Sequence, residues 1–213
     1  ALSKDGTIYT WGDNGSGQLG NGTRTGSNMP VRVVVPSEYG KVKKISCGLE
    51  HNLALTEEGK VLAWGSNVYG ELGDGTEVNR LVPVEVQGLS NIVEISAGNN
   101  SSMALDENGK VWVWGKDVPG HVGDETRCTI ARRIDFSSYY EIKNVSIGCG
   151  WNSALIENAE GLILGWGKEC LANGFIIQTP QLLKNPRDDM VKNIQQIAIG
   201  MHSTLALRED GIV

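Results

Sequence analysis

The amino-acid sequence predicts an all-β fold, a β-propeller of four-stranded antiparallel blades. Three observations support this prediction: a sequence unit that recurs roughly every 50 residues, a hairpin turn at the same place in each unit, and short β-rich runs on both sides of that turn.

The repeat is recognised by a phrase that begins with Ala-Leu and ends with Trp-Gly. ALSKDGTIYTWG opens the chain, and ALTEEGKVLAWG, ALDENGKVWVWG and ALIENAEGLILGWG follow. A partial copy, ALREDGIV, comes last. The units therefore begin at residues 1, 54, 104, 154 and 206, and we expect residues 1–213 to form propeller repeats of an incomplete propeller.

Each unit contains a turn signal, a polar residue followed by glycine, between two apolar runs. Glycine in this position suits the positive backbone angles of a tight hairpin. We therefore predict antiparallel hairpins centred on Gly6, Gly59, Gly109 and Gly161. Strands are expected at 60–64, 110–114 and 162–166, and further β-rich runs such as 81–86 and 92–96 bring the number to four per unit.

Two residue types recur at fixed offsets. Glycines lie six residues before the repeated alanine, which indicates either a positive φ or a close approach between neighbouring blades; they are Gly48, Gly98, Gly148 and Gly200. Tryptophans end the strand after the turn, where we expect them to pack between blades; they are Trp11, Trp64, Trp114 and Trp166.

Composition excludes several classes of protein. The net charge of −6 argues against direct nucleic-acid binding, and the chain has no run of 18 apolar residues that could span a membrane. The opening residues lack the layout of a secretory signal, so we expect an intracellular location, in the cytoplasm or the nucleus. An even number of cysteines (four) permits disulfides, but this setting favours reduced, mostly buried thiols.

No pattern of catalytic or ligand-binding residues stands out. The stretch 15–20 fits Gly-x-Gly-x-x-Gly, but loop-forming residues follow it where a nucleotide site needs a helix. The turn at 74–76 lacks the ligand spacing of a calcium loop, and His51, His121 and His202 share no position that would suit a metal. We expect these histidines to be satisfied within loops, and we expect no enzymatic activity, metal or cofactor.

The recurring residues resemble the regulator-of-chromosome-condensation repeat family. The second unit shows the pattern in full, at Gly48, His51, Ala54, Leu55, Gly59, Val61, Trp64, Gly65, Gly70, Leu72 and Gly73. The first unit matches at 11–12 and 17–20, whereas the third has His121 and Val122 inside its Gly-x-x-Gly and the fourth lacks this loop. The phrase at 150–153 also lacks the arginine and histidine of the family's ultraviolet-B photoreceptor branch, so photoreception is not expected.

The resemblance implies a seven-bladed propeller, of which this chain would be a part; a closed four-bladed ring is the alternative. It also implies two functions. The first is a scaffold whose rim loops bind another protein or a larger assembly. The alternative is guanine-nucleotide exchange on a Ran-like small GTPase, for which the sequence shows no long insertion that could open a nucleotide pocket.

Partner-binding residues are expected where the units differ from one another, because scaffold positions are constrained and loops are free to diverge. We expect such loops at 127–140, 168–180 and 185–190. The candidate contact residues are Arg132, Arg133, Tyr139, Tyr140, Lys168 and Glu169.

Overall fold

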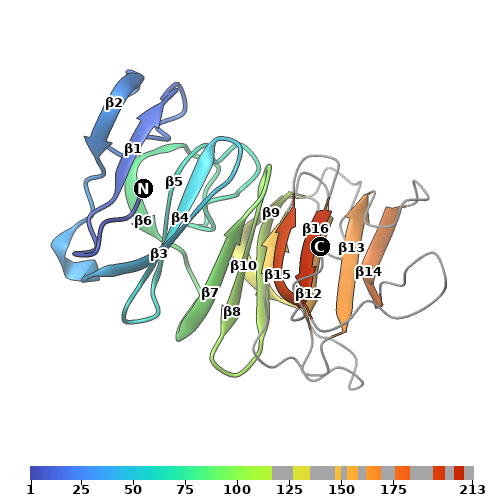
Figure 1. Cartoon of the computed structure of the whole chain (residues 1–213). Helices are drawn as coiled ribbons and strands as arrows, with labels where there is room; N and C mark the ends of the chain where they lie inside the picture. Colours follow the sequence, from blue (N-terminus) through green and yellow to red (C-terminus); the bar gives the residue numbers. More distant parts are fainter. Residues whose placement is uncertain are drawn as a thin grey trace.

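The computed structural model describes residues 1–116, 127–134, 147–149, 153–157, 162–168, 176–182, 194–199 and 204–208 (Figure 1). In these residues the regular structure is β, apart from a single turn of 3-10 helix, η1 (Ser37–Tyr39). The described part of the chain holds no helix with the length and apolar character needed to cross a membrane.

The strands form three four-stranded sheets between two two-stranded ones, and all pairings are antiparallel. The first half-blade consists of β1 (Tyr9–Gly12) and β2 (Ser27–Arg32). Blade 1 consists of β3 (Val42–Cys47), β4 (His51–Thr56), β5 (Val61–Gly65) and β6 (Arg80–Glu85). Blade 2 consists of β7 (Ile92–Ala97), β8 (Ser101–Asp106), β9 (Val111–Lys116) and β10 (Arg127–Arg133). Blade 3 consists of β11 (Ile147–Cys149), β12 (Ser153–Glu157), β13 (Ile163–Lys168) and β14 (Ile176–Leu182), and the last half-blade of β15 (Ile194–Ile199) and β16 (Thr204–Arg208).

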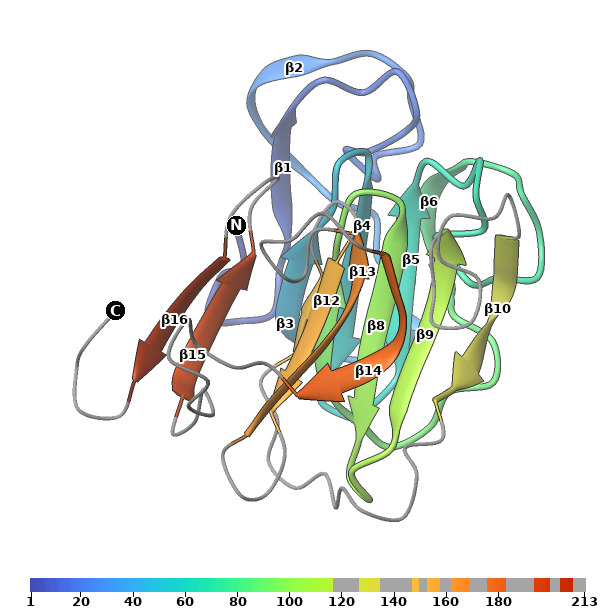
Figure 2. The same cartoon turned by 90° about the vertical axis from the view of Figure 1, so that its right-hand side faces the viewer.

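The sheets stack face to face as an open fan (Figures 1 and 2). The first strand of each sheet contacts the first strand of the next, from β3 to β7, β11 and β15. These are therefore the inner strands, and β2, β6, β10 and β14 form the outer edge. This radial stacking is the architecture of a β-propeller, as predicted.

The blades are out of step with the sequence units. Ala54 opens the second unit, yet it lies in the middle of β4 and pairs with Ile45 of β3, which belongs to the first unit. Ala104 of β8 pairs with Ile95 of β7 in the same way. Each of these two blades thus takes its inner strand from the unit before.

The predicted hairpins are confirmed in the described residues. Gly6, Gly59 and Gly109 have φ angles of 89°, 78° and 73°, as a tight turn requires. Strands β5, β9 and β13 lie at the places predicted for them, whereas Gly161 lies outside the described residues.

The fourth unit has two additional residues between its alanine and its tryptophan, and a register shift accommodates them. Trp64 pairs with Asn52 and Trp114 with Ser102, each two residues before the repeated alanine. Trp166 pairs with Ala154 itself. A shift of two residues keeps every side chain on its face of the sheet, and Trp166 is accordingly buried.

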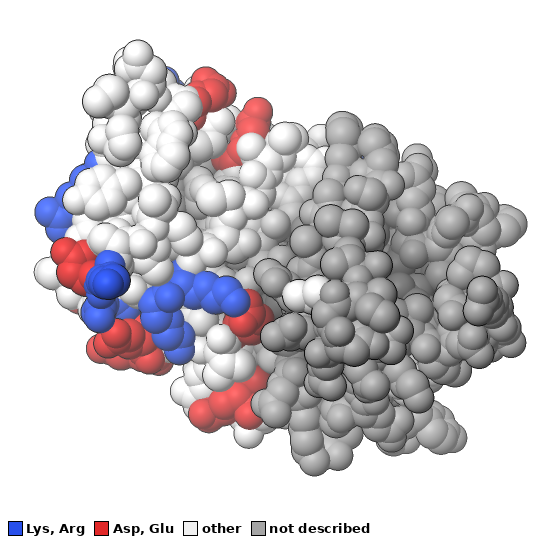
Figure 3. Space-filling view, in the orientation of Figure 1, with Lys and Arg blue, Asp and Glu red and all other residues white. Residues whose placement is uncertain are grey.

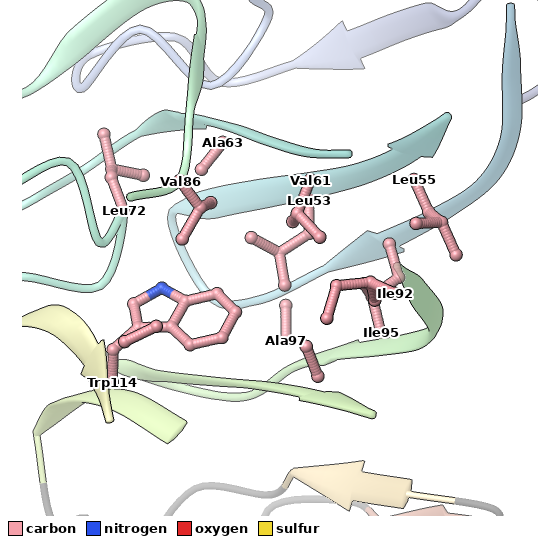
Figure 4. Packing of buried hydrophobic residues seen from close by; sticks show 12 residues of the cluster. Leu53, Leu55, Val61, Ala63, Leu72, Val86, Ile92, Ile95, Ala97 and Trp114 are labelled. Atoms are coloured by element: carbon pink, nitrogen blue, oxygen red, sulfur yellow. The ribbon is translucent and has the colours of Figure 1, made fainter. Parts of the chain in front are cut away.

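The hydrophobic core lies between the sheets. One cluster joins blade 1 to blade 2, with Leu53, Leu72 and Val86 packed against Ile95 and the Trp114 indole (Figure 4). A second cluster joins the first half-blade to blade 1 through side chains such as Ile8, Val33, Leu62 and Trp64. Each strand contributes to both faces of its sheet, which explains the runs without polar alternation.

Cys47 and Cys128 are free thiols, but the expected burial is wrong for Cys47. Cys47 ends the inner strand β3 and is exposed, while Cys128 on the outer strand β10 is half-buried. Burial of part of the Cys47 side chain still raises the pKa of its thiol.

Candidate functional site

A buried asparagine organises the loop after the Trp-Gly strand. The Asn67 amide is fully buried and donates to the carbonyls of Thr76 and Val78 at 3.0 and 3.2 Å, while its oxygen accepts from Leu72 N at 2.9 Å. Asn14 makes the same bonds in the first half-blade, to Thr23 O, Thr25 O and Leu19 N. This role of the asparagine was not predicted from the sequence, although a Trp-Gly-x-Asn pattern in two units signals it.

The Asp74 turn is confirmed as turn chemistry. Its carboxylate accepts from Thr76 N at 3.0 Å, from Asn67 Nδ2 at 3.1 Å and from Arg80 Nε at 2.6 Å. Burial opposes ionisation, but these hydrogen bonds and the arginine lower the pKa of Asp74. The carboxylate is thus occupied by the loop itself.

The tryptophan of one blade closes onto the loop of the blade before. Trp114 Nε1 donates to Glu71 O at 2.8 Å, and an added Cβ at Gly73 would lie 2.9 Å from Trp114 Cδ1. Trp64 repeats the arrangement with Gln18 O at 2.9 Å and with Gly20. The repeated glycine of one blade and the repeated tryptophan of the next therefore pack against each other. This contact between neighbouring blades is called the joint below.

Trp11 corrects the prediction that all four tryptophans pack between blades. Trp64, Trp114 and Trp166 are at most 2% exposed, whereas Trp11 is 54% exposed. Trp64 and Trp114 each contact the loop of the preceding sheet, and among the described residues no sheet precedes the first half-blade, so Trp11 lacks this cover.

A buried polar chain crosses the joint between blades 1 and 2. Ser102 Oγ donates to Glu71 O at 2.9 Å and lies 2.9 Å from His51 Nε2. Because the serine proton is directed to Glu71 O, the histidine donates from Nε2 and Nδ1 is the unprotonated nitrogen. Among the described atoms, Nδ1 has no hydrogen-bond partner. His51 thus lies in a strand rather than in a loop, and it is not fully satisfied, contrary to the expectation from sequence.

Burial shifts the pKa values of the two ionisable residues in this buried polar network, His51 and Glu71. It lowers the pKa of His51 to about 4, so the imidazole is neutral at pH 7. Burial also raises the pKa of the Glu71 carboxyl, against the hydrogen bonds donated by Tyr69 N and Ser66 Oγ. His121 and His202 lie outside the described residues.

Close approach, rather than a positive φ, explains the glycine before the repeated alanine. Gly48 is absent from the positive-φ glycines, but an added Cβ would lie 2.3 Å from Gly98 O of the next blade and 2.4 Å from His51 Cε1. Gly98 O also accepts from Leu49 N at 3.1 Å. Gly148 lies in β11, and Gly200 lies outside the described residues.

The predicted contact residues Arg132 and Arg133 lie on strand β10 rather than in a rim loop. The expected loop at 127–140 is therefore wrong over Arg127–Arg133, where the chain pairs with β9. Both arginines are exposed on the outer strand of blade 2. Lys168 is the last residue of β13, and the expected loop at 168–180 includes the start of β14. The remaining candidates lie outside the described residues; they are Tyr139, Tyr140 and Glu169.

The outer rim next to β10 is rich in cations. Arg127 Nη1 binds Glu77 at 2.8 Å, and both Arg127 and Lys116 lie over the Tyr69 ring, at 5.4 and 4.8 Å from its centroid. Much of the upper surface formed by the loops in Figure 3 is uncharged. In the described residues no group of three or more histidine, cysteine or carboxylate side chains could hold a metal ion.

A pocket of about 450 Å³ lies between the turn at residues 5–8 and the segment that connects β2 to β3. Ile8 and the segment 33–36 line it with apolar groups, and Asp5, Arg32 and Lys41 stand around it. Lys41 also binds Glu57 at 3.3 Å, and hydrogen bonds from Ser3 and Thr7 lower the pKa of Asp5 to about 2. Because Arg32 and Lys41 are positively charged and Asp5 is negatively charged, the pocket favours neither an anion nor a cation.

Comparison with known proteins agrees with this architecture. Residues 5–55 and 58–105 match the Regulator of chromosome condensation (RCC1) repeat. The chain is 44% identical over 92 residues to the RCC1 domain-containing protein RUG3, mitochondrial, and 43% identical over 90 residues to the Ultraviolet-B receptor UVR8, both of Arabidopsis thaliana. These alignments cover 43% and 42% of the chain and 20% of each relative, so the chain spans a small part of those proteins.

Solved structures resemble the whole chain. Human WBSCR16 superimposes with a TM-score of 0.82 at 20% identity, covering 98% of this chain and 55% of that one. Prp20p of Saccharomyces cerevisiae gives a TM-score of 0.80 at 24% identity, covering 100% and 54%. The chain thus spans about half of each of these propellers. The chain consists of β-propeller blades and contains regulator of chromosome condensation repeats at residues 5–55 and 58–105.

Proposed function

We propose that this protein is a scaffold that binds other proteins through its outer surface and rim loops, and that it carries out no catalysis. The proposal includes an intracellular setting, in the cytoplasm or the nucleus. Support comes from how the described residues are used. The residues that recur in the blades, such as Asn67, Trp114 and Gly73, are engaged in contacts within the loops and between the blades.

One exposed position of these loops carries opposite charges in the two blades. The loop held by Asn14 exposes Arg24, whereas the loop held by Asn67 exposes Glu77 at the matching place. The same rigid frame therefore presents different charges at successive positions around the rim. Such an arrangement favours recognition of a protein surface over binding of a small molecule.

Guanine-nucleotide exchange is the alternative. Prp20p of Saccharomyces cerevisiae binds Gsp1p and histones, and that protein shares the fold with this chain. No described loop of this chain is long enough to act as an obvious wedge. The two longest, residues 13–26 and 66–79, are the compact loops organised by Asn14 and Asn67.

The two functions are separated by two measurements on the purified chain. Partners are captured from cells by cross-linking, once with the native chain and once with a variant whose Glu77 and Arg24 are exchanged. Release of labelled nucleotide is measured in parallel with a panel of small GTPases. Loss of specific partners in the exchanged variant supports a scaffold, whereas accelerated nucleotide release establishes the exchange factor and refutes the scaffold proposal.

A further inference from the structure

The pocket between the turn at residues 5–8 and the β2–β3 connection carries charges that the matching place in blade 1 does not have. Arg32 at the end of β2 is matched by Glu85 at the end of β6, as the strand pairings show. Lys41 is matched by Asn91, since the carbonyl of each accepts a hydrogen bond from the first residue of the hairpin turn in the following sheet. The β2–β3 connection is also longer than the β6–β7 connection. The blade fold therefore does not require these two cations at this place.

The charged groups around the pocket are available to a ligand. The Arg32 guanidinium is exposed and makes no ion pair or hydrogen bond within the part of the chain that the structure describes. Lys41 binds Glu57, but both side chains of this pair are about half exposed, and such a pair holds its members weakly. Lys41 Cγ lies 2.5 Å from the place of an added Cβ at Gly6, so its side chain passes over the turn that carries Asp5. One oxygen of Asp5 accepts the hydrogen bonds of this turn, which leaves the other oxygen for a ligand.

The base of the pocket is apolar. Ile8, Val33 and Val42 form its floor and are at most 3% exposed, because they belong to the core cluster between the first half-blade and blade 1. Val35 and Pro36 stand beside them and are half-buried, so they present aliphatic surface to the pocket. The volume of about 450 Å³ lies near the lower end of the range for ligand pockets, about 300–1,000 Å³. The ligand is therefore a small molecule with an apolar part.

We propose that this pocket binds a free aliphatic α-amino acid. The carboxylate of the ligand binds Arg32 and Lys41, and its ammonium group binds the free oxygen of Asp5. Its side chain lies against Val35. A ligand with a single charge would meet a group of its own sign in this pocket, whereas a zwitterion finds an opposite charge for each of its ends. The inference goes beyond the proposed scaffold function and does not depend on it, because the pocket lies at the opposite end of β1 from the loop at 13–26.

The first test measures the binding of leucine to the full 213-residue chain by isothermal titration calorimetry. We expect a dissociation constant of about 1 mM or lower. Two analogues each lack one charge: 4-methylpentanoate has no ammonium group, and 3-methylbutylamine has no carboxylate. Both should bind at least about tenfold more weakly than leucine, because one charged group of the pocket then lacks its partner. Equal binding of either analogue overturns the proposal, as does absence of leucine binding at about 10 mM.

Substitutions test the two ends of the site separately. Arg32→Gln and Asp5→Asn should each weaken leucine binding about tenfold. The turn tolerates asparagine at this position, because the third unit has Asn108 before Gly109 in the same kind of turn. Lys110→Gln is the matched control: it removes a cation from the corresponding hairpin of blade 2, outside the pocket, and should leave binding unchanged. Full binding by either pocket variant refutes the assignment, and so does an equal loss in Lys110→Gln, which would show a general effect of charge.

A further measurement locates the ligand without altering the protein. The backbone amide resonances of Gly6 and Val35 should shift when leucine is added, whereas that of Leu72, at the other end of the blades, should not. Shifts confined to surfaces other than the pocket overturn the proposed site. Neither result affects the scaffold proposal, which is tested by partners captured at the loops.

Discussion

Adding one methyl group at Gly48 should separate blades 1 and 2. An added Cβ would lie 2.3 Å from Gly98 O, a backbone atom of the neighbouring blade that a side-chain rotation cannot move. Relieving the clash requires a displacement of about 1 Å, and the bond from Leu49 N to Gly98 O would be strained or lost. Overpacking costs about 1–3 kcal/mol and a lost hydrogen bond about 1 kcal/mol. We therefore expect Gly48→Ala to lower the free energy of unfolding by about 3 kcal/mol.

Gly15 provides a matched control for this substitution. It lies in an exposed loop without a positive φ, and the nearest atom to an added Cβ is Asp13 Oδ2 at 3.9 Å. Gly15→Ala should change the free energy of unfolding by less than about 0.5 kcal/mol. Urea denaturation followed by tryptophan fluorescence measures both variants. If Gly48→Ala is as stable as Gly15→Ala, close approach between blades is not what requires glycine at this position.

Three further predictions concern the joint and its loop. Burial lowers the pKa of His51 from 6.5 to about 4, so between these pH values the unfolded chain binds a proton that the folded chain does not. The free energy of unfolding should therefore be constant with respect to this group above pH 6.5 and fall by about 3 kcal/mol toward pH 4. Urea denaturation across this range should show a smaller loss in His51→Gln. Trp114→Phe should cost about 2 kcal/mol through the lost bond to Glu71 O, whereas Trp11→Phe should cost almost nothing; equal losses in thermal unfolding would contradict the joint. Asn67→Ala should destabilise by about 3 kcal/mol, because it leaves several buried backbone groups without partners, and faster hydrogen exchange at Leu72 N would report it.

The blades could be predicted from the sequence because they repeat. In each unit a turn glycine marks the hairpin and the apolar runs on both sides of it mark the strands. Gly59 and the strand that ends at Trp64 were placed correctly for this reason. The outer strand β10 was mistaken for a loop, since arginines and a register irregularity hide its alternation. Trp11 was expected to be buried because the pattern alone does not show which sheet face has a neighbour.

The offset between blades and sequence units has a consequence for how such a chain can change in length. Removing residues 54–103 would join Leu53 to Ala104 inside one hybrid strand, followed by β9 and β10. That strand would pair with β3 on one side and β9 on the other, so the hybrid blade would still have its full set of strands. Ala54 and Ala104 are both fully buried, and at the splice point the deletion only replaces one of these alanines by the other. Gain or loss of a whole unit at this alanine therefore changes the number of blades without leaving a sheet incomplete at the junction.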